Sequence, residues 1–279
     1  MDRMMNPYRG LLPFDEQHSS LFFGRDHEIR DVAARLENRR LLAVTGVSGS
    51  GKSSLVRAGV IPMLKAGLIP RFGLDLRVVA FRPGGGPLAE LRQRLSAALR
   101  AEIELDSLTR TTYGLVDTVK QFAAGASLLI LVDQFEEIFQ YRKDRLSVDS
   151  GAEADRFVTL LLRAVEQTDV PIYLILTMRS DYLGECAIFR DLPEALNDGH
   201  YLVPRMTRHQ LQEAIESPLE AVGASMHPKL VQELLNQCVD EADHLPVLQH
   251  LLRRMFEGTA LRRGSHSGPA LAVEGESAQ

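Results

Sequence analysis

Residues 41–53 read LLAVTGVSGSGKS, and this stretch decides the fold. Its first part, Leu41 to Thr45, is a short apolar run typical of a strand that is covered on both faces. Its second part, Gly46 to Ser53, fits the spacing GxxxxGK[ST] at every position, and a helical stretch from Ser54 to Lys65 follows directly. A strand, a glycine-rich loop and a helix in this order predict a phosphate-binding loop. The alternative, a Gly/Ser turn that fits by chance, does not account for the correct flanking segments.

The residue types of this loop fit the chemistry of a nucleoside triphosphate. Glycines let backbone N–H groups curl around the β-phosphate, and the start of a helix favours anions. We expect Lys52 to meet the β- and γ-oxygens and the hydroxyl of Ser53 to bind Mg²⁺. The predicted nucleotide-binding residues of the loop are Gly46, Ser48, Gly49, Ser50, Gly51, Lys52, Ser53 and Ser54.

A second acidic site follows another apolar run. Asp133 ends the run Leu128 to Val132, where a P-loop NTPase needs a carboxylate to hold Mg²⁺, so we predict Asp133 as a metal ligand together with Ser53. A helix N-cap is the alternative for Asp133, because an aspartate often has that role at the end of a strand.

Hydrolysis also needs a base that orients the attacking water. Many P-loop proteins have an acidic residue directly after the metal-binding aspartate, but Gln134 stands at that place here. The next carboxylates are Glu136 and Glu137, and we predict that one of them is the base. Each could instead be a solvated residue in the first turn of a helix over 135–141, where a negative charge is favourable anyway.

The composition excludes several classes of protein. The 279 residues are 45% hydrophobic, which is typical of a globular chain and not of a disordered tail or a coiled-coil rod. Subtracting 37 acidic from 32 basic residues gives a net charge of −5, so we do not expect nucleic acid as the main partner. The longest clean apolar runs, 128–132 and 172–176, are far shorter than the roughly 18 to 20 residues of a membrane-spanning helix.

Residues 1–23 lack the apolar segment of a secretory signal, so we expect no membrane partner and a cytoplasmic location. Cys186 and Cys238 have no metal-ligand spacing and are expected to be buried thiols.

Strands and helices alternate along the chain as far as Pro204. The apolar runs that predict strands of a parallel sheet with helical crossovers are Leu41 to Thr45, Leu76 to Phe81, Leu128 to Val132, Ile172 to Thr177 and Tyr201 to Val203. Helical patterns cover Leu88 to Arg100, Leu115 to Ala123 and Ala154 to Glu166, and three amphipathic helices follow Pro204.

These patterns predict an α/β fold in which a parallel sheet flanked by helices is followed by a small helical domain. The predicted divisions are an N-terminal lead-in over 1–24, the P-loop core over 25–204, a helical lid over 205–257 and a flexible tail over 258–279. Residues 143–153 are predicted to form a surface loop.

The chain resembles the STAND class of P-loop NTPases, and within it the bacterial novel STAND NTPase 1 group, whose members are often fused to WD40 repeats or effector domains. The resemblance covers about residues 6–257. It rests on six blocks in order: Asn6 to Leu11 with Pro13-Phe14, Phe22 to Arg25, the phosphate loop, Val132 to Glu137, Met178 to Leu183, and Leu245 to His250. It implies an ASCE sheet, in which the strand ending in Thr177 lies between the P-loop strand and the strand ending in Val132.

The resemblance also implies roles for four further residues. Arg179 would lie beside the γ-phosphate and distinguish ATP from ADP, a catalytic sensor role; an ion pair with Asp181 or Glu185 is the alternative. Gly24 and Arg25 would line the adenine side, and without the resemblance they are a turn before a helix. Pro246 would contact the base, although a proline in the first turn of a helix needs no such explanation.

STAND proteins as a class hold ADP as closed monomers and assemble when ATP replaces ADP. The resemblance therefore implies an ATP/ADP switch with slow Mg²⁺-dependent hydrolysis, self-oligomerisation and protein partners, in which the nucleotide lies between the sheet domain and the helices after Pro204. One alternative is a nucleotide-binding scaffold without meaningful turnover, and another is a DNA-associated ASCE ATPase.

The resemblance breaks off near residue 257, whereas relatives continue into a winged-helix domain that helps to clamp ADP. From this we expect faster exchange of ADP and self-association through an uncovered face of the helix over 245–255.

Overall fold

The computed structural model describes residues 5–67, 69–143, 149–238 and 244–263. Two compact units are present. One consists of the described residues of 1–29, 48–62 and 204–279, and the other of those of 30–47 and 63–203. We refer to them as the helical unit and the sheet unit.

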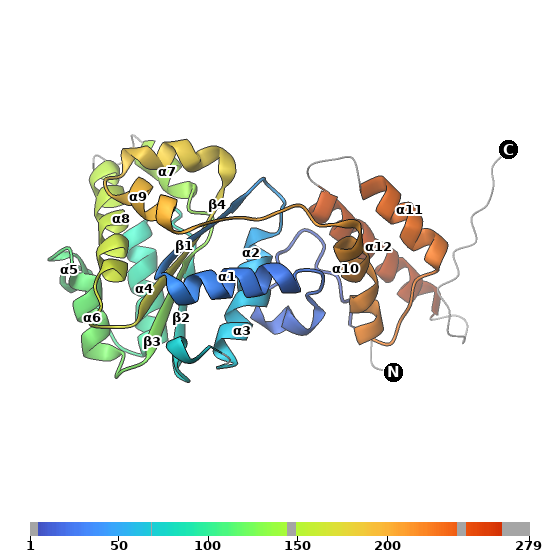
Figure 1. Ribbon diagram of the computed structural model, residues 1–279, viewed down its shortest axis with the longest axis horizontal. Helices are drawn as coiled ribbons and strands as arrows, with labels where there is room; N and C mark the ends of the chain where they lie inside the picture. The colour runs from blue at the N-terminus through green and yellow to red at the C-terminus, as the bar shows by residue number, and fades with distance from the viewer. Residues whose placement is uncertain (1–4, 68, 144–148, 239–243, 264–279) are drawn as a thin grey trace. The chain divides into compact units, whose positions relative to one another are not determined.

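The sheet unit is built on a parallel five-stranded sheet (Figure 1). Its strands are β1 (Leu41–Gly46), β2 (Leu76–Phe81), β3 (Ser127–Val132), β4 (Ile172–Arg179) and β5 (His200–Leu202). They lie in the order β2-β3-β4-β1-β5, and every pair of neighbours is parallel. The predicted α/β fold class is thereby confirmed, as is the expectation that β4 lies between β1 and β3.

Helices pack against the sheet because its strands are apolar on both faces. One core cluster joins Ala43, Ile130 and Leu174 of the sheet to Leu91 of α4 and Phe157 of α8, and Figure 1 shows α4, α6 and α8 gathered on the same side. The connecting elements are α1 (Asp26–Asn38), η3 (Pro70–Phe72), α4 (Pro87–Leu99), α5 (Leu105–Thr109), α6 (Gly114–Phe122), α7 (Glu137–Lys143), α8 (Ser150–Glu166), η4 (Ser180–Ile188) and α9 (Leu192–Asp198).

The opposite face of the sheet is also covered. The ring of Tyr173 in β4 packs on Phe72 with their centroids 4.4 Å apart, and the Tyr173 hydroxyl donates to the Arg71 carbonyl at 3.2 Å. Successive residues of β4 therefore bury their side chains in two different cores.

The helical unit has a core of its own, formed mainly by α10 (Arg208–Ala221), α11 (Pro228–Cys238) and α12 (His244–Arg263). The N-terminal segment belongs to this core, because Tyr8 is buried within it and its hydroxyl donates to the Ile215 carbonyl at 2.5 Å. The side-chain amide of Asn6 donates to the Arg253 carbonyl at 3.2 Å. A short turn, η1 (Glu16–Leu21), follows in the chain.

The helix after the phosphate loop is not uniform. It begins as α2 (Lys52–Ser54), widens into a π-helical stretch, η2 (Leu55–Val60), and continues as α3 (Ile61–Lys65). Pro62 offers a physical reason, because a proline has no N–H and its ring crowds the carbonyl four residues earlier, which a wider turn relieves.

Several predicted boundaries were wrong. The tail was predicted from Gly258, but α12 continues to Arg263, since no helix breaker follows Gly258 there; the rest of the tail lies outside the described residues. Helix α8 begins at Ser150, inside the predicted loop 143–153, and the Glu153 side chain accepts from the Tyr141 hydroxyl at 2.6 Å. Helix α7 begins two residues later than predicted, because residues 133–136 form turns.

Burial raises the pKa of Cys186 to about 12, as expected of an enclosed thiol. The Cys238 side chain is outside the described part of the chain. Within the residues that the structure describes, no helix combines the length and apolar character needed to cross a membrane.

Candidate functional site

The phosphate loop has the backbone that its glycines predict. Gly49 and Gly51 have φ angles of 73° and 84°, a left-handed region that favours glycine. Gly51 is the N-cap of α2, and its carbonyl accepts the N–H of Leu55 at 2.8 Å. Lys52 therefore stands at the start of the helix, where the direction of the backbone N–H groups and the helix dipole favour an anion.

The hydroxyl and amine groups of the loop are placed as follows. The Lys52 Nζ donates to the Ser50 Oγ at 3.5 Å, and the Ser54 Oγ accepts the N–H of Phe14 at 3.1 Å. Ser48 is exposed and Ser53 is half-buried. The contact made by Ser54 ties the loop helix to the N-terminal segment.

Arg25 is held in a buried network inside the helical unit. Its side chain donates to Glu28 Oε1 at 2.9 Å, to the Pro204 carbonyl at 3.0 Å and to the Ser50 carbonyl of the phosphate loop at 3.4 Å. The Gln210 Nε2 donates to both oxygens of Glu28, at 3.0 and 3.1 Å. The guanidinium is thus engaged with protein atoms on several sides.

Gly24, the residue before Arg25, has a steric role. Its φ is +81°, and a Cβ atom there would lie 2.4 Å from the Gln210 carbonyl oxygen and 2.7 Å from Met206 Cε. A Cβ atom at this position would overlap the backbone of Gln210 and the end of the Met206 side chain.

An apolar pocket adjoins the loop within the helical unit. We call it the base pocket; it is lined by Phe14, Leu21, Phe22, Phe23, Arg25, Gly51, Ser54, Met206, Ala214, Leu245 and Gln249. The sequence predicted Arg25, Gly51 and Ser54 among these residues. Pro246 is half-buried and does not line the pocket; instead its neighbour Leu245 does, and so does Gln249 one turn later.

In the sheet unit, Asp133 follows β3 and is completely buried. The Thr177 hydroxyl of β4 donates to Asp133 Oδ1 at 2.6 Å, and Arg82 Nε lies 4.0 Å from Oδ2. Thr177 and Arg82 were not predicted as site residues. Thr177 lies in β4 and Arg82 directly follows β2, the two strands that flank β3, and these positions were the signal available in the sequence.

Thr177 also fixes the backbone after Asp133. Its Oγ1 accepts the N–H of Gln134 at 2.9 Å, and its carbonyl accepts the N–H of Phe135 at 2.8 Å. Gln134 has a φ of 56°, which is uncommon for a residue with a side chain and persists only where neighbouring contacts hold it.

The two candidate bases differ in their surroundings. Glu137 Oε2 accepts the N–H of Gly84 at 3.0 Å, in the loop after β2. Glu136 is half-buried and its negative charge contributes to raising the pKa of Arg179. Glu136 therefore interacts electrostatically with Arg179, whereas Glu137 accepts a hydrogen bond from the backbone.

Arg179 ends β4 and makes the ion pair that the sequence left open as an alternative. Its Nη2 and Nε lie 2.7 and 3.1 Å from the two carboxylate oxygens of Asp181, and this pairing raises its pKa. Arg179 pairs in register with Gly46 of β1, so the first residue of the phosphate loop, Arg179 and Asp133 are all at the carboxyl-terminal edge of the sheet. Ligands of open α/β sheets bind outside this edge.

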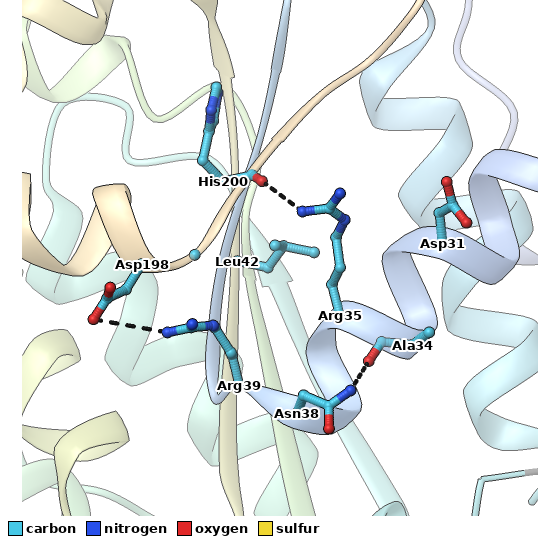
Figure 2. A pocket seen from close by; sticks show the side chains of 9 residues that line it. Asp31, Ala34, Arg35, Asn38, Arg39, Leu42, Asp198 and His200 are labelled. Atoms are coloured by element: carbon cyan, nitrogen blue, oxygen red, sulfur yellow. Dashed lines mark hydrogen bonds and ion pairs between the residues drawn. The ribbon is translucent and has the colours of Figure 1, made fainter.

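A larger cavity, of about 330 Å³, lies elsewhere in the sheet unit, beside α1 and β5 (Figure 2). Its charged groups are turned toward protein partners: Arg35 donates to the His200 carbonyl at 3.3 Å, and Arg39 lies 3.7 Å from Asp198. Burial, with Arg35 nearby, lowers the pKa of His200, whose Nε2 is 2.6 Å from Thr45 Oγ1. None of the predicted site residues lines this cavity.

The sequence matches the family described as Novel STAND NTPase 1 over residues 7–270, which extends past the predicted end of the resemblance near 257. A second similarity is partial. Over an alignment of 148 residues the chain is 31% identical to the ATP-dependent lipid A-core flippase of Alkalilimnicola ehrlichii. This alignment covers 49% of this chain and 23% of the flippase. The chain therefore spans about a quarter of that relative's length.

Solved structures share the fold at low sequence identity. The Aeropyrum pernix ORC2 protein in its ADPNP-ADP complexes has a TM-score of 0.59 and 14% identity, over 86% of this chain and 64% of ORC2. The Walker-type ATPase PABY2304 of Pyrococcus abyssi has a TM-score of 0.53 and 16% identity, over 91% of this chain and 73% of its own. A chain of the E. coli MS115-1 HORMA:CdnC:Trip13 complex has a TM-score of 0.53 and 16% identity, over 90% of this chain and 85% of its own. These similarities show a P-loop ATPase fold.

Proposed function

The chain belongs to the Novel STAND NTPase 1 family, and from this premise we propose that it is an ATP- and ADP-binding signalling switch that hydrolyses ATP slowly with Mg²⁺. The observation that carries the proposal is the phosphate loop: two glycines with positive φ lead from a buried strand to a helix that begins at Lys52. A loop of this shape presents N–H groups and a lysine to phosphate oxygens.

The donor set fits Mg²⁺. Ser53 offers a hydroxyl and Asp133 a buried carboxylate, and Mg²⁺ prefers such hard oxygen ligands together with phosphate oxygens and water. When bound, the ion would neutralise charge on the β- and γ-phosphates. Thr177 and Arg82 hold the Asp133 carboxylate in place for this role.

For hydrolysis we assign Glu136 as the base that orients water and Arg179 as the sensor of the γ-phosphate. Support for Glu136 over Glu137 comes from the hydrogen bond that already engages Glu137 with Gly84. Arg179 would have to exchange its pairing with Asp181 for a phosphate oxygen, and because Arg179 is exposed such an exchange costs little desolvation.

We further propose that the bound nucleotide controls conformation and self-association, that protein partners receive the signal, and that the protein acts in the cytoplasm. The support is family membership and the likeness to a chain of the HORMA:CdnC:Trip13 complex, which is an assembly of several proteins. Domains that sense the signal and act on it are outside this proposal.

A nucleotide-binding scaffold without turnover is the second candidate. Two observations favour it: Gln134 stands where a base is often found, and Glu137 is occupied by the Gly84 N–H. Measuring phosphate release and nucleotide binding on the same preparation separates the two candidates. A scaffold binds ATP but releases phosphate no faster than ATP does in buffer without protein.

Replacing Lys52 tests the proposal as a whole. Calorimetry with Mg²⁺-ATP should show that Lys52→Ala loses affinity by at least about tenfold while its circular dichroism is unchanged, since Lys52 is half-buried in the loop and not part of a core. Lys65→Ala, an exposed lysine of α3, is the matched control and should bind like the wild type. Equal affinity in all three proteins would refute the assignment of the phosphate loop.

A further inference from the structure

Gln249 carries an unused acceptor in the wall of the base pocket. It lies on α12, one turn after Leu245, and both residues line the pocket. Its Oε1 is buried and, among the described residues, has no hydrogen-bond partner. A buried amide oxygen without a donor is costly, and such groups are rare in folded proteins.

The other polar side chains of the pocket are already engaged. The guanidinium of Arg25 donates to Glu28, Pro204 and Ser50, and the Ser54 hydroxyl accepts the Phe14 N–H. Among the described residues that line this pocket, Gln249 is the one with a buried side-chain atom that has no hydrogen-bond partner, and a ligand could supply it.

The remaining walls indicate which part of a nucleotide the pocket receives. Phe14, Leu21, Phe22, Phe23, Met206, Ala214 and Leu245 supply aromatic and aliphatic surface. Gly51 of the phosphate loop also lines the pocket, so a ligand whose phosphates lie on the loop would bring its flat, weakly polar base here. A phosphate group or the hydroxyls of a ribose would lose hydrogen bonds to water against these apolar walls.

Position 6 of the purine decides which base the amide favours. Adenine has an amino group there, which donates, whereas guanine has a carbonyl oxygen, which accepts. An adenine amino group satisfies the buried Oε1 of Gln249, whereas a guanine oxygen cannot donate to this atom and leaves it unpaired. A site built to bond a particular polar group rejects analogues that lack it.

We propose that Gln249 is the specificity-determining residue for adenine, accepting a hydrogen bond from its exocyclic amino group. This inference rests on the proposed nucleotide-binding function and deepens it, because that proposal names ATP and ADP but assigns no side chain to the recognition of the adenine amino group.

The test compares three Mg²⁺-bound probes by calorimetry: ATP, GTP, and purine riboside triphosphate, which has hydrogen in place of the amino group. The wild type should bind ATP about tenfold more tightly than purine riboside triphosphate, as the loss of one buried hydrogen bond implies. Gln249→Leu should reduce ATP binding to the level of purine riboside triphosphate and leave that probe unchanged.

Gln249→Glu gives a second measurement, because a carboxylate can only accept. It should keep a preference for ATP over purine riboside triphosphate and weaken GTP further. Val247→Ala, at a position of α12 that is 66% exposed, is the control and should preserve all three affinities.

Different failures are distinguishable. If the wild type binds none of the three triphosphates, the proposed function falls and this inference with it. If ATP binds but Gln249→Leu weakens ATP and purine riboside triphosphate equally, or changes neither, Gln249 only packs against the base or does not contact it, and the inference alone is overturned.

Discussion

At the scale of single residues, Thr177 determines how Asp133 is presented. Its hydroxyl donates to the Asp133 carboxylate and accepts the Gln134 N–H, so one oxygen holds both the proposed metal ligand and the strained backbone that follows it. The hydroxyl lies in a buried strand, where an unmade hydrogen bond carries its full desolvation cost.

We predict that Thr177→Val lowers the free energy of unfolding by about 1–3 kcal/mol and weakens binding of ATP more in Mg²⁺ than in EDTA. Urea denaturation and calorimetry measure the two effects. Thr177→Ser keeps the hydroxyl and should retain most of the Mg²⁺ dependence. Loss of Mg²⁺ dependence in both variants would mean that the methyl group, not the hydroxyl, is what matters.

The two glutamates after Asp133 should behave differently in turnover. We predict that Glu136→Gln slows phosphate release at least about tenfold with ATP affinity kept, whereas Glu137→Gln changes the rate little, because Glu137 binds the Gly84 N–H. Single-turnover measurement of phosphate release makes the comparison. Full activity in Glu136→Gln would remove it as the base.

Glu28 should make the stability of the helical unit depend on pH. Burial raises its pKa, but hydrogen bonds from its own backbone and Gln210 and the charge of Arg25 outweigh burial, so the pKa of Glu28 is lower than usual. A carboxyl group with a lowered pKa stabilises the fold fully at pH values above its pKa in the unfolded chain, about 4.3. This contribution is lost as the pH falls through its lower pKa in the folded protein.

We therefore predict that Glu28→Gln destabilises the protein by about 3–5 kcal/mol at pH 7, because a buried arginine loses its charge partner. The difference from wild type should shrink between about pH 5 and pH 3. Urea denaturation across this range measures it. Glu90→Gln removes an exposed pair with Arg94 and is the control, with an expected effect below about 1 kcal/mol at every pH.

At the scale of elements, close contacts join segments that are distant in sequence. Gly24 precedes α1, and its missing side chain leaves room for the backbone of α10 at Gln210. We predict that Gly24→Ala costs about 3 kcal/mol or more, from the positive φ and the steric overlap together.

Gly84→Ala is the matched control, because Gly84 also has a positive φ, +54°, but a Cβ atom there would meet nothing within 4 Å. It should cost about 1–2 kcal/mol. Thermal unfolding compares the two variants. Equal losses would show that conformational strain, and not contact with α10, explains the glycine at position 24.

The strands and most helices were predictable because their signals are local. An apolar run such as Leu128 to Val132 identifies a buried strand without knowledge of its neighbours, and the glycine spacing identifies the loop. The order of the strands came from the resemblance, since periodicity carries no information on neighbours.

What could not be predicted depends on long-range contacts. The lead-in residues Asn6 and Tyr8 bind α12 and α10, which lie 247 and 207 positions later in the chain. The same is true of the base pocket, whose aromatic residues precede α1 while Gln249 belongs to α12. Phenylalanines near the N-terminus are compatible with any core, so only the fold identifies them as pocket walls.

At the scale of the whole molecule, the helical unit should respond to nucleotide at places that are far apart in sequence. The base pocket draws on 14–25, 51–54, 206–214 and 245–249, all of which belong to the helical unit. A ligand that binds the folded state stabilises it by about 2.7 kcal/mol when present at a hundredfold excess over its dissociation constant.

We predict that saturating ADP slows amide hydrogen exchange in these four segments together, and in 51–54 most, because the phosphate loop would donate its N–H groups to the ligand. Duplex DNA at low salt should leave exchange unchanged, since a chain with a net charge of −5 gains little from releasing counterions. Mass spectrometry of exchange follows both ligands on one preparation. Protection by DNA and none by ADP would favour the DNA-associated ATPase, whereas protection by ADP of 51–54 without 245–249 would locate the base outside the pocket that contains Gln249.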